Sequence, residues 1–111
     1  MNVELQRSKA DRLRELHLGD DVLVLPNAWD PLSARVFEAC GFPAIATTSA
    51  GIAYALGYPN GEKLGRKEMT VATSLIADAV GVPVTADVET GHGPSPQEAA
   101  ETARAMIGAG P

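Results

Sequence analysis

The feature that most constrains the fold is a repeated pattern in which a helix ends at glycine and a strand follows a proline. The segments "EACGFPAIATTSAG" and "ADAVGVPVTADVETG" both have it, with Gly41 and Gly81, and likewise Pro43 and Pro83, 40 residues apart. A glycine just past a helix accepts the left-handed conformation that closes the last turn. A proline soon afterwards prevents the helix from continuing. The pattern predicts successive units of strand, loop and helix.

Local signals predict where helices begin. Asp30 precedes Pro31 and Ser95 precedes Pro96, so each pair matches an N-cap residue followed by proline at the first helical position. Glu98, three residues after Ser95, completes a capping box. The sequence predicts helices over residues 3–17, 31–40, 67–80 and 96–107, strands over residues 22–25, 44–49 and 83–88, and a long loop over residues 49–66.

Strands that alternate with helices predict a parallel sheet, because parallel neighbours need crossover connections. Units of this length fit either a (β/α)₈ barrel or a doubly wound sheet, and in both the chemistry gathers where strands end. The segments "NAWD" and "TTSAG" and the acids Asp87 and Glu89 fall at such ends. No G-x-G-x-x-G motif follows the first strand, which disfavours a small flavodoxin-like domain. We therefore expect a site on one rim of the sheet.

Composition narrows the partners and the compartment. The 111 residues carry a net charge of −5, which disfavours binding to nucleic acid or to an anionic membrane. No apolar run approaches the roughly 20 residues that cross a bilayer, and the charged N-terminus does not resemble a signal peptide. Cys40 is the single cysteine, so it cannot form an internal disulfide. These features predict a cytoplasmic protein.

Two longer stretches carry a family resemblance. "LPNAWDPLSARVFEACGFPAIATTSAGIAYALGYPNGE" and "VPVTADVETGHG" resemble the phosphoenolpyruvate mutase/isocitrate lyase superfamily, and within it the members similar to 2-methylisocitrate lyase and carboxyphosphonoenolpyruvate phosphonomutase. The resemblance implies a (β/α)₈ TIM barrel preceded by an N-terminal helix, and a Mg²⁺-dependent lyase. It implies a small α-oxo or α-hydroxy carboxylate as substrate, cleavage of a C–C or P–C bond through an enolate, and a homo-oligomeric parent protein.

The resemblance also implies roles for particular residues. Asp87 and Glu89 match the family's metal-binding acids after the third strand, and Thr48, Ser49 and Ala50 match the loop that holds the substrate carboxylate. Asn60 falls in the family's gating loop, at a position that is commonly acidic. The family's catalytic loop would lie beyond Pro111, so catalytic residues are not assigned in this chain.

Physical chemistry gives these assignments a rationale and an alternative. Residues two apart on a strand face the same side, so Asp87 and Glu89 could point toward one cation, and Mg²⁺ needs only one or two carboxylates together with water and substrate oxygens. The acids could instead be solvated loop charges or helix caps. Thr48 and Ser49 could bind an anion or merely cap a turn, and His92 is expected to be an exposed loop histidine.

Length sets the last expectation. A (β/α)₈ barrel typically needs about 250 residues, whereas this chain supplies three strand–helix units. We expect an N-terminal helix over residues 1–20 and a partial barrel over residues 21–111, truncated before the fourth strand. The isolated chain is then expected to be inactive even if its parent is a lyase. The alternative is a non-catalytic fragment with at most weak anion or metal binding.

Overall fold

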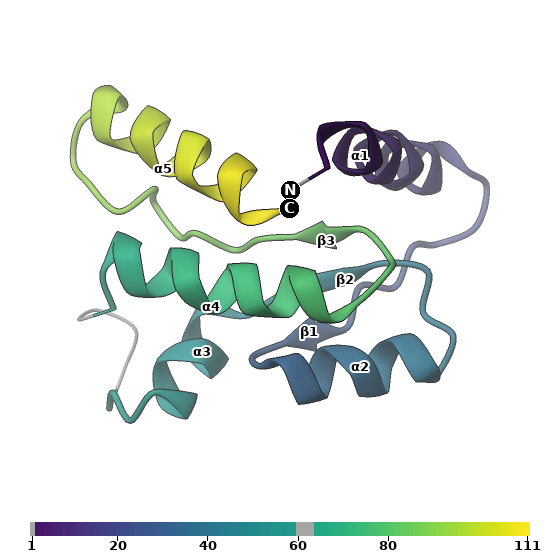
Figure 1. Ribbon diagram of the computed structural model, residues 1–111, viewed down its shortest axis with the longest axis horizontal. Coiled ribbons are helices and arrows are strands. Elements are labelled where there is room, and N and C mark those ends of the chain that lie inside the picture. Colours follow the sequence, from purple (N-terminus) through teal and green to yellow (C-terminus); the bar gives the residue numbers. More distant parts are fainter. Residues whose placement is uncertain (1, 60–63) are drawn as a thin grey trace.

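The computed structural model describes residues 2–59 and 64–111 and has the expected α/β architecture (Figure 1). Within these residues the elements are, in chain order, α1 (Val3–Leu18), β1 (Asn27–Ala28), α2 (Pro31–Ala39), β2 (Ile45–Thr47), α3 (Ser49–Ala55), α4 (Arg66–Ala79), β3 (Val84–Thr85) and α5 (Pro96–Ala109). None of these helices combines the length and apolar character needed to span a bilayer.

The three strands form a parallel sheet in the order β1-β2-β3. Asn27 pairs with Ala46, and Ala46 pairs with Thr85 on the other side of β2, so these three residues form one row across the sheet. The chain returns through a helix between successive strands, as parallel neighbours require. The predicted parallel sheet is confirmed, and it is an unclosed part of a barrel rather than a closed one.

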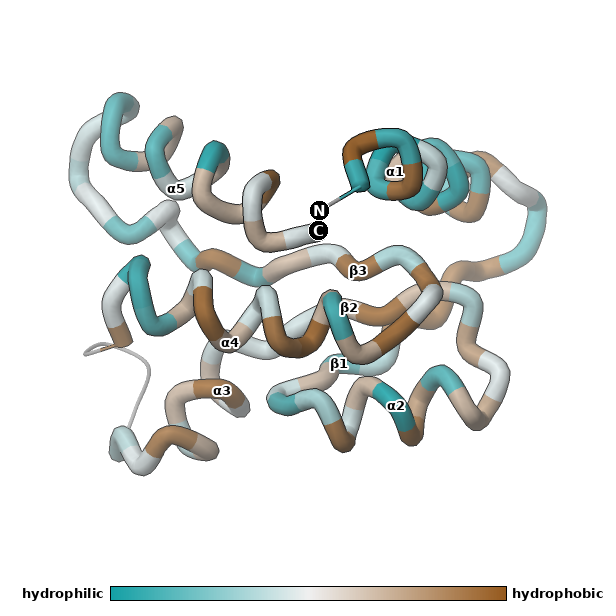
Figure 2. The backbone as a smooth tube through the Cα atoms, viewed as in Figure 1, coloured by the Kyte–Doolittle hydropathy of each residue, from teal (hydrophilic) through white to brown (hydrophobic). Residues whose placement is uncertain are grey.

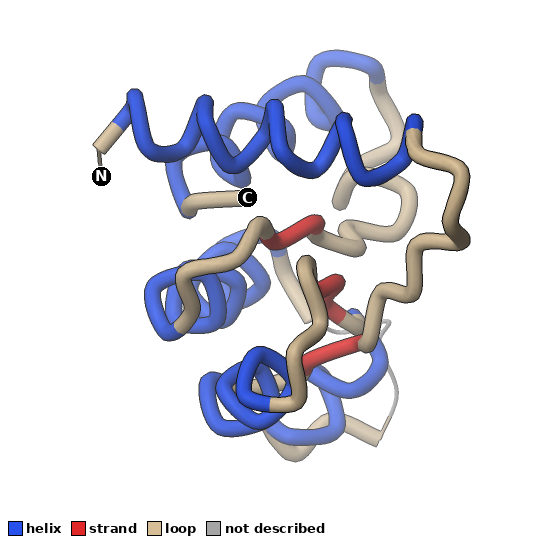
Figure 3. Tube along the Cα trace, turned by 90° about the vertical axis from the view of Figure 1, so that its right-hand side faces the viewer, coloured by secondary structure: helices blue, strands red, loops and turns tan. Residues whose placement is uncertain are grey.

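One face of the sheet is covered by helices. Ala28, Ile45 and Val84 point to this face and are at most 6% exposed, because α2 packs on β1 and β2 and against α4. Figure 3 shows helices on one side of the strands, while the segment between α1 and β1 runs along the other. The buried cluster that joins these layers is made by Ala28, Ala34, Ile45, Ile52, Met69, Ile76, Val84 and Met106.

The other face of the sheet is more open. Its middle row consists of Asn27, which is exposed, and of Ala46 and Thr85, which are half-buried. Small and polar residues alternate with apolar ones because successive side chains on a strand point to opposite faces. The apolar residues therefore gather under the helices and the open face stays small and polar.

The predicted helix starts are confirmed at two positions. The Asp30 side chain accepts the Ser33 N–H at 2.7 Å at the start of α2. The Ser95 hydroxyl accepts the Glu98 N–H at 3.2 Å, and the Glu98 carboxylate accepts the Ser95 N–H at 3.1 Å, which is the predicted capping box of α5. Local sequence signals of this kind therefore located both starts.

The two glycines of the repeat differ. Gly41 has φ +92°, the left-handed conformation that its position predicts, whereas Gly81 is not left-handed and that expectation is wrong. The N–H groups of Gly81 and Val82 donate instead to one carboxylate oxygen of Glu38, at 2.7 and 3.1 Å. A side chain from the preceding repeat thus satisfies the turn, so the backbone needs no left-handed residue there.

Two further boundaries were wrong. Residues 22–25 were predicted as the first strand, but pairing begins only where the Ala46 N–H donates to the Pro26 carbonyl. Val22 and Val24 are 88% and 58% exposed, and no strand of residues 2–59 or 64–111 pairs with them. Residues 49–66 were predicted as a loop, but α3 begins at Ser49 directly after β2. This helix was missed because its small residues form no clear apolar stripe, so that its main sequence signal is the N-cap at Thr48.

The N-terminal helix is attached by polar contacts. α1 ends at Gly19 as predicted and has no buried residue, and Figure 2 shows it to be mostly hydrophilic. The Gln6 amide donates to the carbonyls of Ile107 and Pro111, and the Lys9 ammonium donates to the carbonyl of Val80. These carbonyls lie at or just after the C-terminal ends of α5 and α4. The half-buried Leu13 and Leu16 add apolar contact, so α1 is held by hydrogen bonds to other helix ends and by two leucines.

Candidate functional site

A direct hydrogen bond joins two of the predicted polar segments at the carboxyl end of the sheet. The Ser49 hydroxyl donates to Asp87 Oδ2 at 2.8 Å, and the Ser49 N–H approaches the same oxygen at 3.4 Å. The Asp87 N–H donates to the Thr47 hydroxyl at 2.9 Å. Both segments follow adjacent parallel strands, β2 and β3, so their ends meet at one edge. Asp87 and Ser49 therefore share one rim.

Asp87 is held as a carboxylate. Its Oδ1 accepts the Glu89 N–H at 3.0 Å, while Oδ2 accepts from Ser49. The Glu89 N–H lowers the pKa of the Asp87 carboxyl most, and the Ser49 hydroxyl and N–H and the charge of nearby His92 lower it further, against an opposing effect of partial burial. Hydrogen bonds to the charged form favour ionisation. Asp87 is therefore a charged group held in place by short contacts.

Glu89 is not part of a strand. β3 ends at Thr85, and Glu89 has φ +56°, a left-handed conformation that is uncommon for a residue other than glycine. The strand predicted over residues 83–88 is therefore too long, and the argument that residues two apart on a strand face the same way does not apply to Asp87 and Glu89. The contact between them runs instead through the Glu89 backbone N–H, which donates to Asp87 Oδ1, in a turn where the Gly91 N–H donates to the Val88 carbonyl at 2.9 Å.

Two of the three residues expected to hold a substrate carboxylate, Thr48 and Ser49, already form hydrogen bonds within the protein. The Thr48 side chain accepts the Gly51 N–H at 3.2 Å and is the N-cap of α3, which is the turn-capping role that the sequence left open. Ser49 is 6% exposed and donates to Asp87, whereas Ala50 is exposed. Binding of a substrate by these residues stays a prediction. Asn60, assigned to a gating loop, lies outside the described residues.

Asp87 retains capacity for a cation. Each oxygen of an ionised carboxylate has two acceptor positions. Oδ2 of Asp87 accepts from both the hydroxyl and the N–H of Ser49, whereas Oδ1 accepts from the Glu89 N–H and keeps one position open. Among residues 2–59 and 64–111, no three His, Cys, Asp or Glu side chains gather closely enough to hold a metal ion. A site on this rim would therefore be a sparse oxygen site, which suits Mg²⁺ better than zinc.

His92 differs from its expectation. It was predicted to be an exposed loop histidine, but it is half-buried and has φ +57°. Its Nε2 is enclosed and has no hydrogen-bond partner in the described part of the chain. No motif in the sequence indicates this burial, because it depends on how the loop packs against α5.

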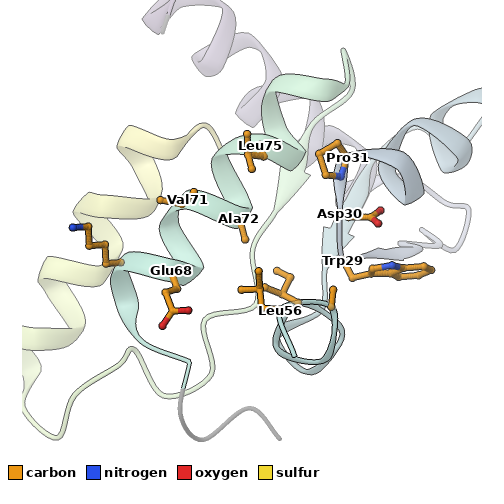
Figure 4. A pocket seen from close by; sticks show the side chains of 11 residues that line it. Trp29, Asp30, Pro31, Leu56, Glu68, Val71, Ala72 and Leu75 are labelled. Carbon is orange, nitrogen blue, oxygen red and sulfur yellow. The ribbon is translucent and has the colours of Figure 1, made fainter. Parts of the chain in front are cut away.

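An apolar groove of about 480 Å³ lies elsewhere, between α3, α4 and the turn into α2 (Figure 4). Its apolar walls are formed by Trp29, Pro31, Ile52, Leu56, Val71 and Leu75. Its carboxylates already have partners: Asp30 caps α2, and Glu68 accepts the hydroxyl of Tyr58, a bond that raises the pKa of that phenol. Asp87 and Ser49 do not line this groove. The charged site and the apolar groove are therefore separate.

The parallel strands, the helices between them and the acid on the rim define an α/β chain of the type that forms the first part of a (β/α)₈ barrel. Comparison with known proteins agrees: the sequence profile of the family described as Phosphoenolpyruvate phosphomutase matches residues 13–111. The chain belongs to this family, as its sequence predicted, and corresponds to the N-terminal portion of its members.

Individual relatives also match this chain over only part of their own length. 2,3-Dimethylmalate lyase of Eubacterium barkeri is 39% identical over 85 residues, which are 76% of this chain and 29% of that protein. The crystal structure of phosphoenolpyruvate phosphomutase from Streptomyces platensis subsp. rosaceus has a TM-score of 0.84 and 33% identity, covering 91% of this chain and 35% of that one. Oxaloacetate acetylhydrolase in complex with oxalate has a TM-score of 0.83 and 36% identity, covering 93% and 37%. The chain spans about a third of the length of these relatives.

Proposed function

We propose that this chain supplies the metal-binding and carboxylate-binding rim of a Mg²⁺-dependent lyase that acts on a small α-oxo or α-hydroxy carboxylate. The observation that carries the proposal is the 2.8 Å hydrogen bond from the Ser49 hydroxyl to Asp87 Oδ2. It brings the acid assigned to the metal and the segment assigned to the substrate within contact distance. The named relatives, a 2,3-dimethylmalate lyase and an oxaloacetate acetylhydrolase, support the proposed class of substrate.

Asp87 is the principal metal ligand in this proposal. Its carboxylate is ionised and restrained, so little conformational freedom is lost when a cation binds. Glu89 supplies the second carboxylate from the adjacent turn, and water and substrate oxygens complete the coordination. Bound there, a divalent ion supplies positive charge that stabilises negative charge on a substrate oxygen.

Ser49 acts in this proposal mainly by holding Asp87 in place. Its single O–H donates to Asp87, so that O–H cannot donate to a substrate carboxylate at the same time. The exposed Ala50 and the first turn of α3 remain on the solvent side of the rim. A substrate carboxylate would therefore reach this rim largely through the metal, with Thr48 and Ser49 shaping the space beside it.

Metal binding by residues 1–111 tests the proposal without requiring turnover. Mn²⁺ is a paramagnetic substitute for Mg²⁺, so a titration followed by electron paramagnetic resonance measures its affinity directly. Wild-type chain should bind one Mn²⁺, Mg²⁺ should compete for it, and oxalate should tighten the binding. Asp87→Asn should weaken Mn²⁺ binding by at least about tenfold, since a neutral amide replaces the charged ligand.

Asp78→Asn is the matched control, because Asp78 is an exposed acid on α4 outside the rim. It removes the same charge and should leave Mn²⁺ affinity unchanged. If wild type and Asp87→Asn bind Mn²⁺ equally, Asp87 is not the ligand and the metal assignment is wrong. Oxalate binding that does not depend on Mn²⁺ would instead support a rim that binds anions alone, which is the non-catalytic alternative.

A further inference from the structure

The loop between β3 and α5, which carries both rim acids, has an unusual backbone. Glu89 and His92 have φ +56° and +57°, and they are the two non-glycine residues with positive φ in the described part of the chain. Between them, Gly91 has φ +95°. Left-handed conformations of residues other than glycine persist only where surrounding contacts enforce them. Contacts with the rest of the protein must therefore hold this loop in its conformation.

The loop lies tightly against the first turns of α5. A Cβ atom on Gly91 would lie 3.0 Å from the Ala99 Cβ, and one on Gly93 would lie 2.4 Å from the Glu98 Cβ. Such distances leave no room for a side chain at either glycine. Close packing of this kind fixes where the loop sits, but it does not pair the polar groups of its backbone.

The Thr102 side chain forms a hydrogen bond with the carbonyl of Gly91, at the centre of this turn. Thr102 is 1% exposed, and its hydroxyl lies 2.5 Å from the Gly91 carbonyl oxygen and 3.2 Å from the Glu98 carbonyl oxygen. Arg66 Nε donates to the same hydroxyl oxygen at 2.8 Å. Because the arginine cannot accept, the hydroxyl proton must be directed to a carbonyl, and the Gly91 oxygen is the nearer.

Arg66 is itself anchored across two helices. It is the first residue of α4, and its two terminal nitrogens donate to the Glu101 carboxylate at 3.0 Å and to the Glu98 carbonyl at 3.2 Å. The guanidinium therefore makes three directed hydrogen bonds to α5, a geometry that the single ammonium of lysine cannot reproduce. A continuous chain of hydrogen bonds runs from α4 through Thr102 to the loop.

We propose that Arg66 and Thr102 are positioning residues, forming a polar strut that holds the acid-bearing loop of residues 87–93 in the conformation that presents Asp87 and Glu89 at the rim. Neither residue touches the carboxylates, so both act through the Gly91 carbonyl. The effect on metal affinity rests on the proposed function above. The effect on the loop backbone does not.

Thr102→Val tests the strut, since valine has nearly the shape of threonine but no hydroxyl. The Gly91 N–H bonds across the same turn, so its hydrogen exchange, measured by NMR, should become at least about tenfold faster. Mn²⁺ should bind about tenfold more weakly, the lower end of the effect seen for groups that orient metal ligands. Thr102→Ser keeps the hydroxyl and should restore both values toward wild type.

Thr73→Val is the matched control. Thr73 is equally buried, on α4, but its hydroxyl has no partner among the described residues. Removing it takes the same atom from the interior without breaking a hydrogen bond, so loop exchange and Mn²⁺ affinity should not change. Glu101→Gln removes only the exposed ion pair of Arg66 and should also have little effect.

The possible outcomes separate the two proposals. If Thr102→Val leaves both Gly91 exchange and Mn²⁺ affinity at wild-type values, the strut is wrong. If wild type binds no Mn²⁺, the proposed function fails, while Gly91 exchange still decides the strut. Should Thr102→Val not fold, Arg66→Lys provides the milder test, with the same direction expected in both measurements and unchanged values overturning the proposal.

Discussion

The two faces of the sheet use the same three strands for different purposes. On the covered face, Ile45 pairs with Val84 and both are buried under the helices. On the open face, Ala46 pairs with Thr85 and both stay partly exposed. A shift of one residue along β2 therefore separates a well-packed core from a surface of small residues.

The difference shows how stability and function are divided in this chain. Apolar burial is confined to one face, so the open face and its rim can carry charge without disturbing the core. Family members close this sheet into a barrel, whose interior is the face left open here. Asp87 lies beyond the carboxyl end of β3, beside Ser49. Substitutions on the two faces should consequently differ in size.

The largest effect is expected from Ile45→Ala. Ile45 is fully buried at the centre of the core, and truncation of such a side chain typically costs about 2–5 kcal/mol through lost burial and a residual cavity. Urea unfolding followed by circular dichroism would measure the loss. A cost below about 1 kcal/mol would mean that the covered face is not the main source of stability.

A smaller loss is expected from Gly51→Ala, in the first turn of α3. A Cβ there would lie 2.6 Å from Thr48 Cγ2 and 3.0 Å from Trp29 Cβ, and overpacking of this kind costs about 1–3 kcal/mol. Gly108→Ala is the matched control, because Gly108 lies within α5 and has open space around it. It should stabilise the chain by about 0.5–1 kcal/mol through helix propensity. Equal effects of the two substitutions in thermal unfolding would contradict the close contact at Gly51.

The contribution of Asp87 to stability should depend on pH. Hydrogen bonds lower the pKa of Asp87 in the folded chain, so its contribution to stability is present above the unfolded pKa of about 3.9 and is lost as pH falls through the folded value. Asp87→Asn should therefore be less stable than wild type at neutral pH, and the difference should shrink below about pH 4. Urea unfolding at a series of pH values measures this. A difference that stays constant across the acid range would show that Asp87 is not stabilised as a carboxylate.

The smallest effect is expected from Ala46→Ser, on the open face next to Ile45. The added hydroxyl can reach water because Ala46 is only half-buried, so stability should change by no more than about 0.5 kcal/mol. The same unfolding experiment that measures Ile45→Ala gives this value. A loss comparable to that of Ile45→Ala would break the comparison, because both faces would then be tightly packed.

The elements that sequence alone predicted are those with local causes. The caps at Asp30 and Ser95 involve residues within one helical turn, and the helix predicted over residues 67–80 agrees within one residue at each end. The strand predicted over residues 22–25 was wrong, because a strand is defined by its neighbour and apolar residues alone do not provide one. The turn at Gly81 depends on Glu38, 43 residues earlier, which no local pattern indicates.

The candidate site could likewise be predicted from the sequence only in part. The topology of parallel strands was enough to predict that Ser49 and Asp87, 38 residues apart, lie on one rim. The conformation of Glu89 was not predictable, since it depends on contacts between the loop and α5 rather than on strand alternation. Thr102 was missed for the same reason: a buried threonine inside a helix has no sequence signature of a positioning role.

The attachment of α1 has a consequence for how unfolding would be observed. The slope of stability against denaturant scales with the surface that unfolding exposes. No residue of α1 is fully buried, and Gln6, Lys9, Leu13 and Leu16 are half-buried. Local unfolding of α1 would therefore expose less surface than global unfolding, and its amide protons would exchange with solvent ahead of those in β2. A sharp chemical transition and an early-exchanging first helix can thus belong to the same molecule.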